Sequence, residues 1–108
     1  MNEASELLPG TLDLLILKAI SLESLHGYGV LLRIEQITNG GLRIPQGSLY
    51  PALYRLEARE WIGSEWGESD NKRKAKFYKL TAAGRKRLRT ESKSWAHFAS
   101  CVQAALSA

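Results

Sequence analysis

The chain has 108 residues, of which 44% are hydrophobic, and it carries 15 Lys and Arg against 11 Asp and Glu. This length supplies one modest hydrophobic core and excludes two independently folding domains. The single cysteine, Cys101, excludes an intrachain disulfide, while an acidic start and Lys18 inside the longest apolar stretch predict a cytoplasmic protein without a membrane span.

The first forty residues predict two helices. Thr11 can cap a helix over residues 11–22, whose apolar positions recur at helical spacing. The two glycines of HGYGV then act as a hinge into a second helix over residues 28–38. Asn39 and Gly40 are expected to end that helix because both tolerate a positive φ. The side chains expected on the buried faces are Leu12, Leu15, Ile16, Ala19 and Ile20 in the first helix and Val30, Leu31, Ile34 and Ile37 in the second.

The stretch RIPQGSLYPALYRLE predicts a third helix over about residues 48–60. Pro51 cannot donate a hydrogen bond to the carbonyl of Gly47, so the helix is expected to begin no earlier than Gly47, with Ser48 as its N-cap. The free N–H groups of its first turn suit an anion such as a phosphate. The side chains expected around them are Gln46, Ser48 and Tyr50. Two alternatives stay open, because Ser48 is also explained as a simple cap and Tyr50 as a buried ring.

A hairpin and a long helix are predicted for the remainder. WIGSEWGES and KFYKL are short strand-like runs on either side of a charged tip at residues 70–74. Tyr78 and Leu80 are expected to be buried, Trp61 and Trp66 to be packing residues, and Thr81 to cap the last helix. Residues 72–93 hold ten basic residues and one acid, which is typical of a phosphate-binding surface but also of a solvated helix face.

The last helix carries an apolar seam in which Leu88, Trp95 and Val102 repeat every seven residues. The flanking members of this seam are Phe98, Ala99 and Leu106. Because the preceding core can hardly cover the far end of this helix, we expect a second copy of the chain to cover it. The alternative is a helix that folds back on the first helix. Trp95 is then either interface filler or the wall of a drug-sized apolar pocket.

The order helix, helix, strand stub at 42–44, helix, hairpin, helix predicts a winged helix-turn-helix. Its third helix would enter the major groove of DNA, and its wing would touch phosphates. The wing residues in that position are Lys72, Arg73 and Lys74. No enzyme signature is present, and His26 and His97 lie too far apart along the chain to indicate a metal site. We therefore expect no catalysis, no metal and no cofactor.

Three segments in order resemble the PadR family of bacterial transcriptional regulators: LLPGTLDLLILKAISLESLHGYGV, IPQGSLYPALYRLEAREWI and WGESDNKRKAKFYKLTAAGRKRL. The resemblance implies a homodimer built through the C-terminal helix with help from the first helix, and repression that a small molecule relieves. It also implies that Tyr28 contacts the DNA backbone. The residues it places at the start of the recognition helix are Ser48, Tyr50 and Pro51, and those it places on the wing are Lys72, Arg73 and Lys74. With one helix after the wing, the chain resembles the short branch of the family.

We therefore predict a mainly helical α+β protein with a winged helix-turn-helix DNA-binding domain at residues 7–84 and a C-terminal dimerisation helix at 85–108. It is expected to bind double-stranded DNA as a homodimeric repressor, relieved by a small aromatic ligand. Two other functions stay open. One is a protein-interaction module whose basic face meets an acidic partner, and the other is a ligand sensor without specific DNA binding.

Overall fold

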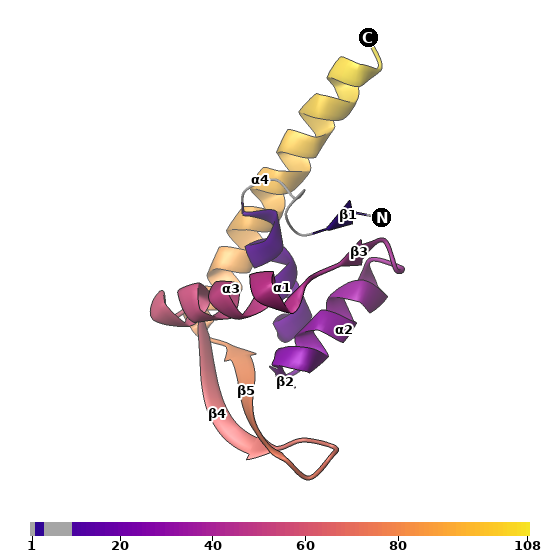
Figure 1. Ribbon diagram of the computed structural model, residues 1–108. Helices are drawn as coiled ribbons and strands as arrows, with labels where there is room; N and C mark the ends of the chain where they lie inside the picture. Colours follow the sequence, from indigo (N-terminus) through magenta and orange to yellow (C-terminus); the bar gives the residue numbers. More distant parts are fainter. Residues whose placement is uncertain (1, 4–9) are drawn as a thin grey trace.

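The computed structural model describes residues 2–3 and 10–108 and shows an α+β winged helix with a long projecting helix (Figure 1). The helices are α1 (Thr11–Leu22), α2 (Gly27–Ile37), α3 (Gln46–Ala58) and α4 (Ala82–Leu106). The strands are β1 (Asn2–Glu3), β2 (Leu25–His26), β3 (Leu42–Arg43), β4 (Ile62–Glu68) and β5 (Lys74–Leu80). The β4–β5 hairpin, called the wing below, and the free end of α4 extend in opposite directions, so the molecule is 54 Å long.

The core lies around α1, which contacts α2, α3, α4 and β5. The predicted buried faces of α1 and α2 are confirmed at their centres, where Ile16, Ala19, Ile20, Val30 and Ile34 are buried. Ile37, the last residue of α2, is exposed instead, so the prediction that it is buried is wrong. The third helix adds four buried side chains, as many as α1, and they are Leu49, Ala52, Leu53 and Leu56.

The first two helices begin differently from the prediction. Gly10, with φ 83°, occupies the N-cap of α1, so Thr11 is the first helical residue and the prediction that it caps the helix is wrong. His26 caps α2 through its Nδ1, which accepts a hydrogen bond from the Gly29 N–H at 3.0 Å. The predicted end of α2 is confirmed, because Asn39 and Gly40 both have positive φ.

The third helix begins two residues before the predicted start. Pro45 is its N-cap, and the Pro45 carbonyl accepts from the N–H of Ser48 at 3.0 Å and of Leu49 at 3.1 Å. The prediction that Ser48 is the N-cap is therefore wrong. Pro51 lies inside the helix and deprives the Gly47 carbonyl of its helical donor, but Gly47 is exposed, so water can satisfy that carbonyl.

The hairpin is confirmed, with β4 and β5 antiparallel from Ile62 opposite Leu80 to Glu68 opposite Lys74. Tyr78 and Leu80 are buried, as predicted. A third strand, β2, pairs with β5 on the other side, which the sequence did not indicate. The wing is thereby joined directly to the start of α2.

The start of α4 is fixed by hydrogen bonds that Thr81 both donates and accepts. Thr81 caps the helix by accepting from the Gly84 N–H at 3.0 Å, as predicted. Its hydroxyl also donates to the Glu60 carbonyl at 2.7 Å, and its N–H donates to the Trp61 carbonyl at 3.2 Å. Gly84 lies so close to the same turn that an added Cβ would be 1.9 Å from the Trp61 oxygen. The direction in which α4 leaves the core is therefore set by the α3–β4 turn.

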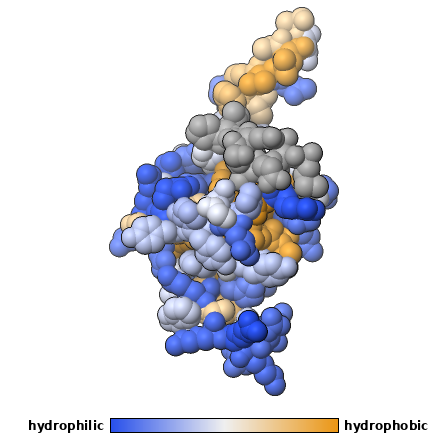
Figure 2. Space-filling model, viewed as in Figure 1, coloured by the Kyte–Doolittle hydropathy of each residue, from blue (hydrophilic) through white to orange (hydrophobic). Residues whose placement is uncertain are grey.

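None of the helices in the described part of the chain is long and apolar enough to cross a membrane. The far half of α4 nevertheless carries large apolar side chains that are exposed in the described structure, namely Trp95, Phe98, Val102 and Leu106. Figure 2 shows this projecting end in orange, whereas the wing at the opposite end is hydrophilic.

Candidate nucleic-acid interface

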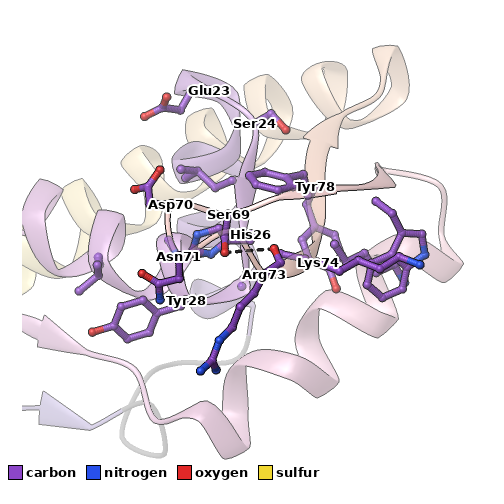
Figure 3. Close-up of a pocket in the computed structure, with 18 of the residues that line it drawn as sticks. Glu23, Ser24, His26, Tyr28, Ser69, Asp70, Asn71, Arg73, Lys74 and Tyr78 are labelled. Carbon is purple, nitrogen blue, oxygen red and sulfur yellow. Dashed lines mark hydrogen bonds between the residues drawn. The ribbon is translucent and has the colours of Figure 1, made fainter.

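An open groove lies between the start of α2 and the wing, and we call it the wing groove (Figure 3). It brings together four of the predicted DNA-binding residues, namely Tyr28, Tyr50, Arg73 and Lys74. Gln46, Ser48 and Pro51 do not line it and lie along the first half of α3, and Lys72 lies at the tip of the wing. Three elements that are distant in sequence thus present one surface.

The start of α2 is held by its neighbours in the sheet. His26 pairs with Phe77 across β2 and β5, and their rings meet edge to face with centroids 5.3 Å apart. Because His26 also caps the helix, its ring connects the wing to the first turn of α2. Tyr28 lies in that turn, lines the groove and has an exposed side chain, whose hydroxyl points outward at the edge of the groove (Figure 3).

Tyr50 reaches across from α3 and packs on Gly27. A Cβ at position 27 would lie 2.6 Å from the Tyr50 hydroxyl, so the ring occupies space that any other residue there would need. The interpretation of Tyr50 as a buried ring is wrong, because 46% of the side chain is exposed. The contact brings the first turns of α2 and α3 together, and an exposed phenol remains at their junction.

The wing carries cations that no acidic side chain neutralises. Lys72, Arg73 and Lys74 are exposed and form no ion pair with any carboxylate in the described residues. The tip is ordered by its own backbone, because the Ser69 N–H donates to the Arg73 carbonyl and the Lys72 N–H donates to the Ser69 carbonyl. Cations that are held in place but unpaired suit a phosphate backbone.

The base of the wing is pinned to α3 through Glu57. Its carboxylate accepts hydrogen bonds from the Ser64 hydroxyl on β4 and from the Lys76 ammonium on β5, the latter at 3.1 Å. The Ser64 hydrogen bond, followed by Lys76, holds the pKa of Glu57 below its usual value. Glu57 is therefore ionised at neutral pH and joins both wing strands to α3.

Two exposed aromatic residues differ from the sequence prediction: Trp66 was expected to pack, and Tyr54 was not singled out. Trp66 is not a packing residue, since 64% of it is exposed in the wing groove, with the Lys74 ammonium 5.3 Å from its ring centroid. Trp66 lies on the same face of β4 as Ile62, which is buried. It is exposed because β4 extends beyond the core and Trp66 lies in the projecting part. Tyr54 on α3 is also largely exposed. The exposure of Tyr54 could have been predicted, because helical spacing places it on the side of α3 opposite the buried leucines.

The predicted seam on α4 divides into two parts. Leu88 is partly buried and packs against the core, and Ala99 is partly buried. The large side chains farther along the helix are exposed, and they are Trp95, Phe98, Val102 and Leu106. Among the described residues, no group of three His, Cys, Asp or Glu side chains is arranged to hold a metal ion.

The family model described as "Transcriptional regulator PadR-like family" matches residues 16–90. "Uncharacterized protein X" of Lysinibacillus sphaericus is 33% identical over 92 residues, which cover 85% of this chain and 84% of that protein. An "Uncharacterized 37.1 kDa protein in transposon TN4556" of Streptomyces fradiae is 37% identical over 90 residues, but these are only 24% of its length. A PadR-like transcriptional regulator from Bacillus cereus is 28% identical with a TM-score of 0.76, covering 90% of this chain and 92% of that one.

The contact between Gly27 and Tyr50 gives a first prediction. Gly27→Ala should push the Tyr50 ring out of its place, because the clashing atoms are the far end of a side chain that can rotate into solvent. We expect DNA affinity to fall about tenfold, with the free energy of unfolding changed by less than about 1 kcal/mol. Mobility-shift titration and thermal unfolding measure the two quantities.

Gly29→Ala is the matched control, because its added Cβ would meet Leu25 at 3.4 Å, an ordinary contact. If Gly27→Ala binds DNA as the wild type does, the position of Tyr50 does not matter for binding.

Proposed function

The chain belongs to the PadR-like family of transcriptional regulators, and from this premise we propose that it is a homodimeric repressor that binds a specific operator through α3 and the wing. The family consists of DNA-binding regulators and not of enzymes. We place its action in the cytoplasm, where bacterial DNA is found. The observation that supports the proposal is the convergence of Tyr28, Tyr50, Arg73 and Lys74 on the wing groove.

In this proposal the two surfaces have different tasks. Helix α3 lies in the major groove, with Gln46, Ser48, Tyr50 and Pro51 in its first half, and Tyr28 touches the flanking backbone. The wing contacts phosphates through Lys72, Arg73 and Lys74, which supplies affinity without sequence preference. Two copies related by a two-fold axis would meet half-sites about 34 to 36 Å apart, so the operator would be a pseudo-palindrome.

The proposed dimer is made through α4. Exposed large apolar side chains on one side of a helix that leaves the core are stabilised when a second helix covers them. Trp95, Phe98, Val102 and Leu106 form such a side, and Ala99 lies among them and allows close approach. We accordingly divide the chain into a DNA-binding domain at residues 7–84 and a dimerisation helix at 85–108, with Leu88 at the boundary.

Removal of wing cations tests the DNA contact. Lys72→Ala, Arg73→Ala and Lys74→Ala should each weaken binding to all sequences similarly. Each should also reduce the slope of log affinity against log salt by about 0.9 for every phosphate that the variant no longer neutralises. Titrations at several salt concentrations measure the slope.

Lys93→Ala is the control for this series, because Lys93 is an exposed cation on α4. Slopes that stay at the wild-type value in all three wing variants would remove the wing from the interface. Weak, sequence-blind binding by the wild type would instead favour the protein-interaction module.

A charge on the apolar side of α4 tests the dimer. Phe98→Glu places a carboxylate among the exposed apolar residues, so we expect a monomer at micromolar concentration where the wild type is a dimer. Gel filtration with light scattering measures the mass. Ala96→Glu is the control, because residue 96 is exposed about half a turn away from Phe98. A monomeric wild type would contradict the proposal.

Relief by a small aromatic ligand is the last part of the proposal. Trp95 and Phe98 are broad, exposed and one turn apart, so two copies of each could form the walls of an apolar pocket at the interface. A planar aromatic ligand should quench tryptophan fluorescence in the wild type and quench it less in Trp95→Phe. Equal quenching in both proteins, or none across a broad panel of compounds, would contradict the pocket.

A further inference from the structure

The outer face of α3 carries one large side chain at its centre. The buried residues Leu49, Leu53 and Leu56 define the inner face. At 3.6 residues per turn, Gly47, Tyr54 and Ala58 fall within about 40° of one another on the opposite side. Of these, Tyr54 is the largest, and 78% of it is exposed. A helix that lies in a major groove presents this face to the floor of the groove.

The neighbours of Tyr54 on this face do not extend as far from the helix axis as the Tyr54 side chain. Gly47 has no side chain, and an added Cβ there would meet nothing within 4 Å. Pro51 and Ala58 are short and carry no hydrogen-bonding group. Arg55 is long, but its guanidinium donates to the Asp13 carboxylate on α1 at 2.7 Å, which draws it back toward the core.

Tyr50 lies one turn before Tyr54, but its ring rests against Gly27 at the edge of the helix. Among the described residues of α3, Tyr54 is therefore the long side chain on the middle of the outer face, and neither a hydrogen bond nor an ion pair directs it back toward the protein. Its ring loses exposed apolar surface when DNA covers it, and its hydroxyl can donate or accept a hydrogen bond.

We propose that Tyr54 is a specificity-determining residue that reads a base pair in each half-site. This inference rests on the proposed function. Its ring would contact the C5-methyl group of a thymine, and its hydroxyl would bond to an adjacent base edge. Tyr54 is uncharged, so it offers little to a phosphate, whereas the unpaired wing cations are suited to that task.

The test is selection of bound duplexes from a random-sequence library with the wild type, Tyr54→Ala, Tyr54→Phe and Tyr54→Gln. The wild type should prefer a thymine at one position of each half-site. Tyr54→Ala should lose this preference by about tenfold, with the slope of affinity against salt unchanged. Tyr54→Phe should keep the thymine preference and lose the one at the neighbouring base.

Tyr54→Gln distinguishes a lost base contact from a general loss of binding, because this variant is expected to gain a preference for a different base. Glutamine pairs with the N6 and N7 groups of adenine, so the preferred base should change to adenine at that position. Thermal unfolding should be unchanged in all three variants, because the side chain is exposed.

The outcomes separate this inference from the function on which it rests. If the wild type selects a motif that Tyr54→Ala and Tyr54→Gln also select, Tyr54 reads no base and the inference is overturned while the function stands. A reduced salt slope with an unchanged motif would make Tyr54 a phosphate contact and overturn the inference as well. If the wild type selects no motif, the proposed operator recognition fails, and the inference fails with it.

Discussion

The position of the proposed DNA-binding surface depends on one close contact, between Gly27 and the ring of Tyr50. Because Gly27 has no Cβ, the ring of a residue on α3 can lie directly on the first turn of α2. The two helix starts then sit side by side, and His26 links α2 in turn to Phe77 on the wing. A larger residue at position 27 would displace the Tyr50 ring from this junction, while buried residues such as Ile34, Leu49 and Leu53 would keep the core in place.

A second constraint fixes the angle of the wing. A two-stranded hairpin alone is marginally stable in water. Here β2 adds a third strand, and the Glu57 carboxylate bonds to a residue on each long strand. The pair is partly exposed, so its contribution to stability is modest and its main effect is on orientation. The lysines and arginine at the tip therefore have a defined position relative to α3, as simultaneous contact with one duplex requires.

The features of the fold that depend on a few neighbouring residues could be predicted from the sequence. The Thr81 cap, the turn at Asn39 and Gly40, and the burial of Tyr78 and Leu80 are of this kind. The β2 strand was missed because two residues carry no periodicity, and its partner β5 lies about fifty residues later. The exposure of Trp66 was missed because alternation along a strand identifies a face, but not where the core beneath that face ends. Sequence reasoning also gave Ser48 the capping role that the Pro45 carbonyl fulfils.

The joint at Gly84 connects the two halves of the proposed function. In the proposed dimer, the spacing of the two recognition helices follows from the angle between α3 and α4. That angle is set where Thr81 bonds to the carbonyls of Glu60 and Trp61, and where the missing side chain of Gly84 lets α4 approach the Trp61 carbonyl. Glu60 completes this turn with a φ of 62°, which is uncommon for a residue with a side chain. A change in how two copies of α4 cross would therefore be carried through this joint to α3 and alter the half-site spacing. An interfacial ligand would need no contact with the DNA-binding surface to affect binding.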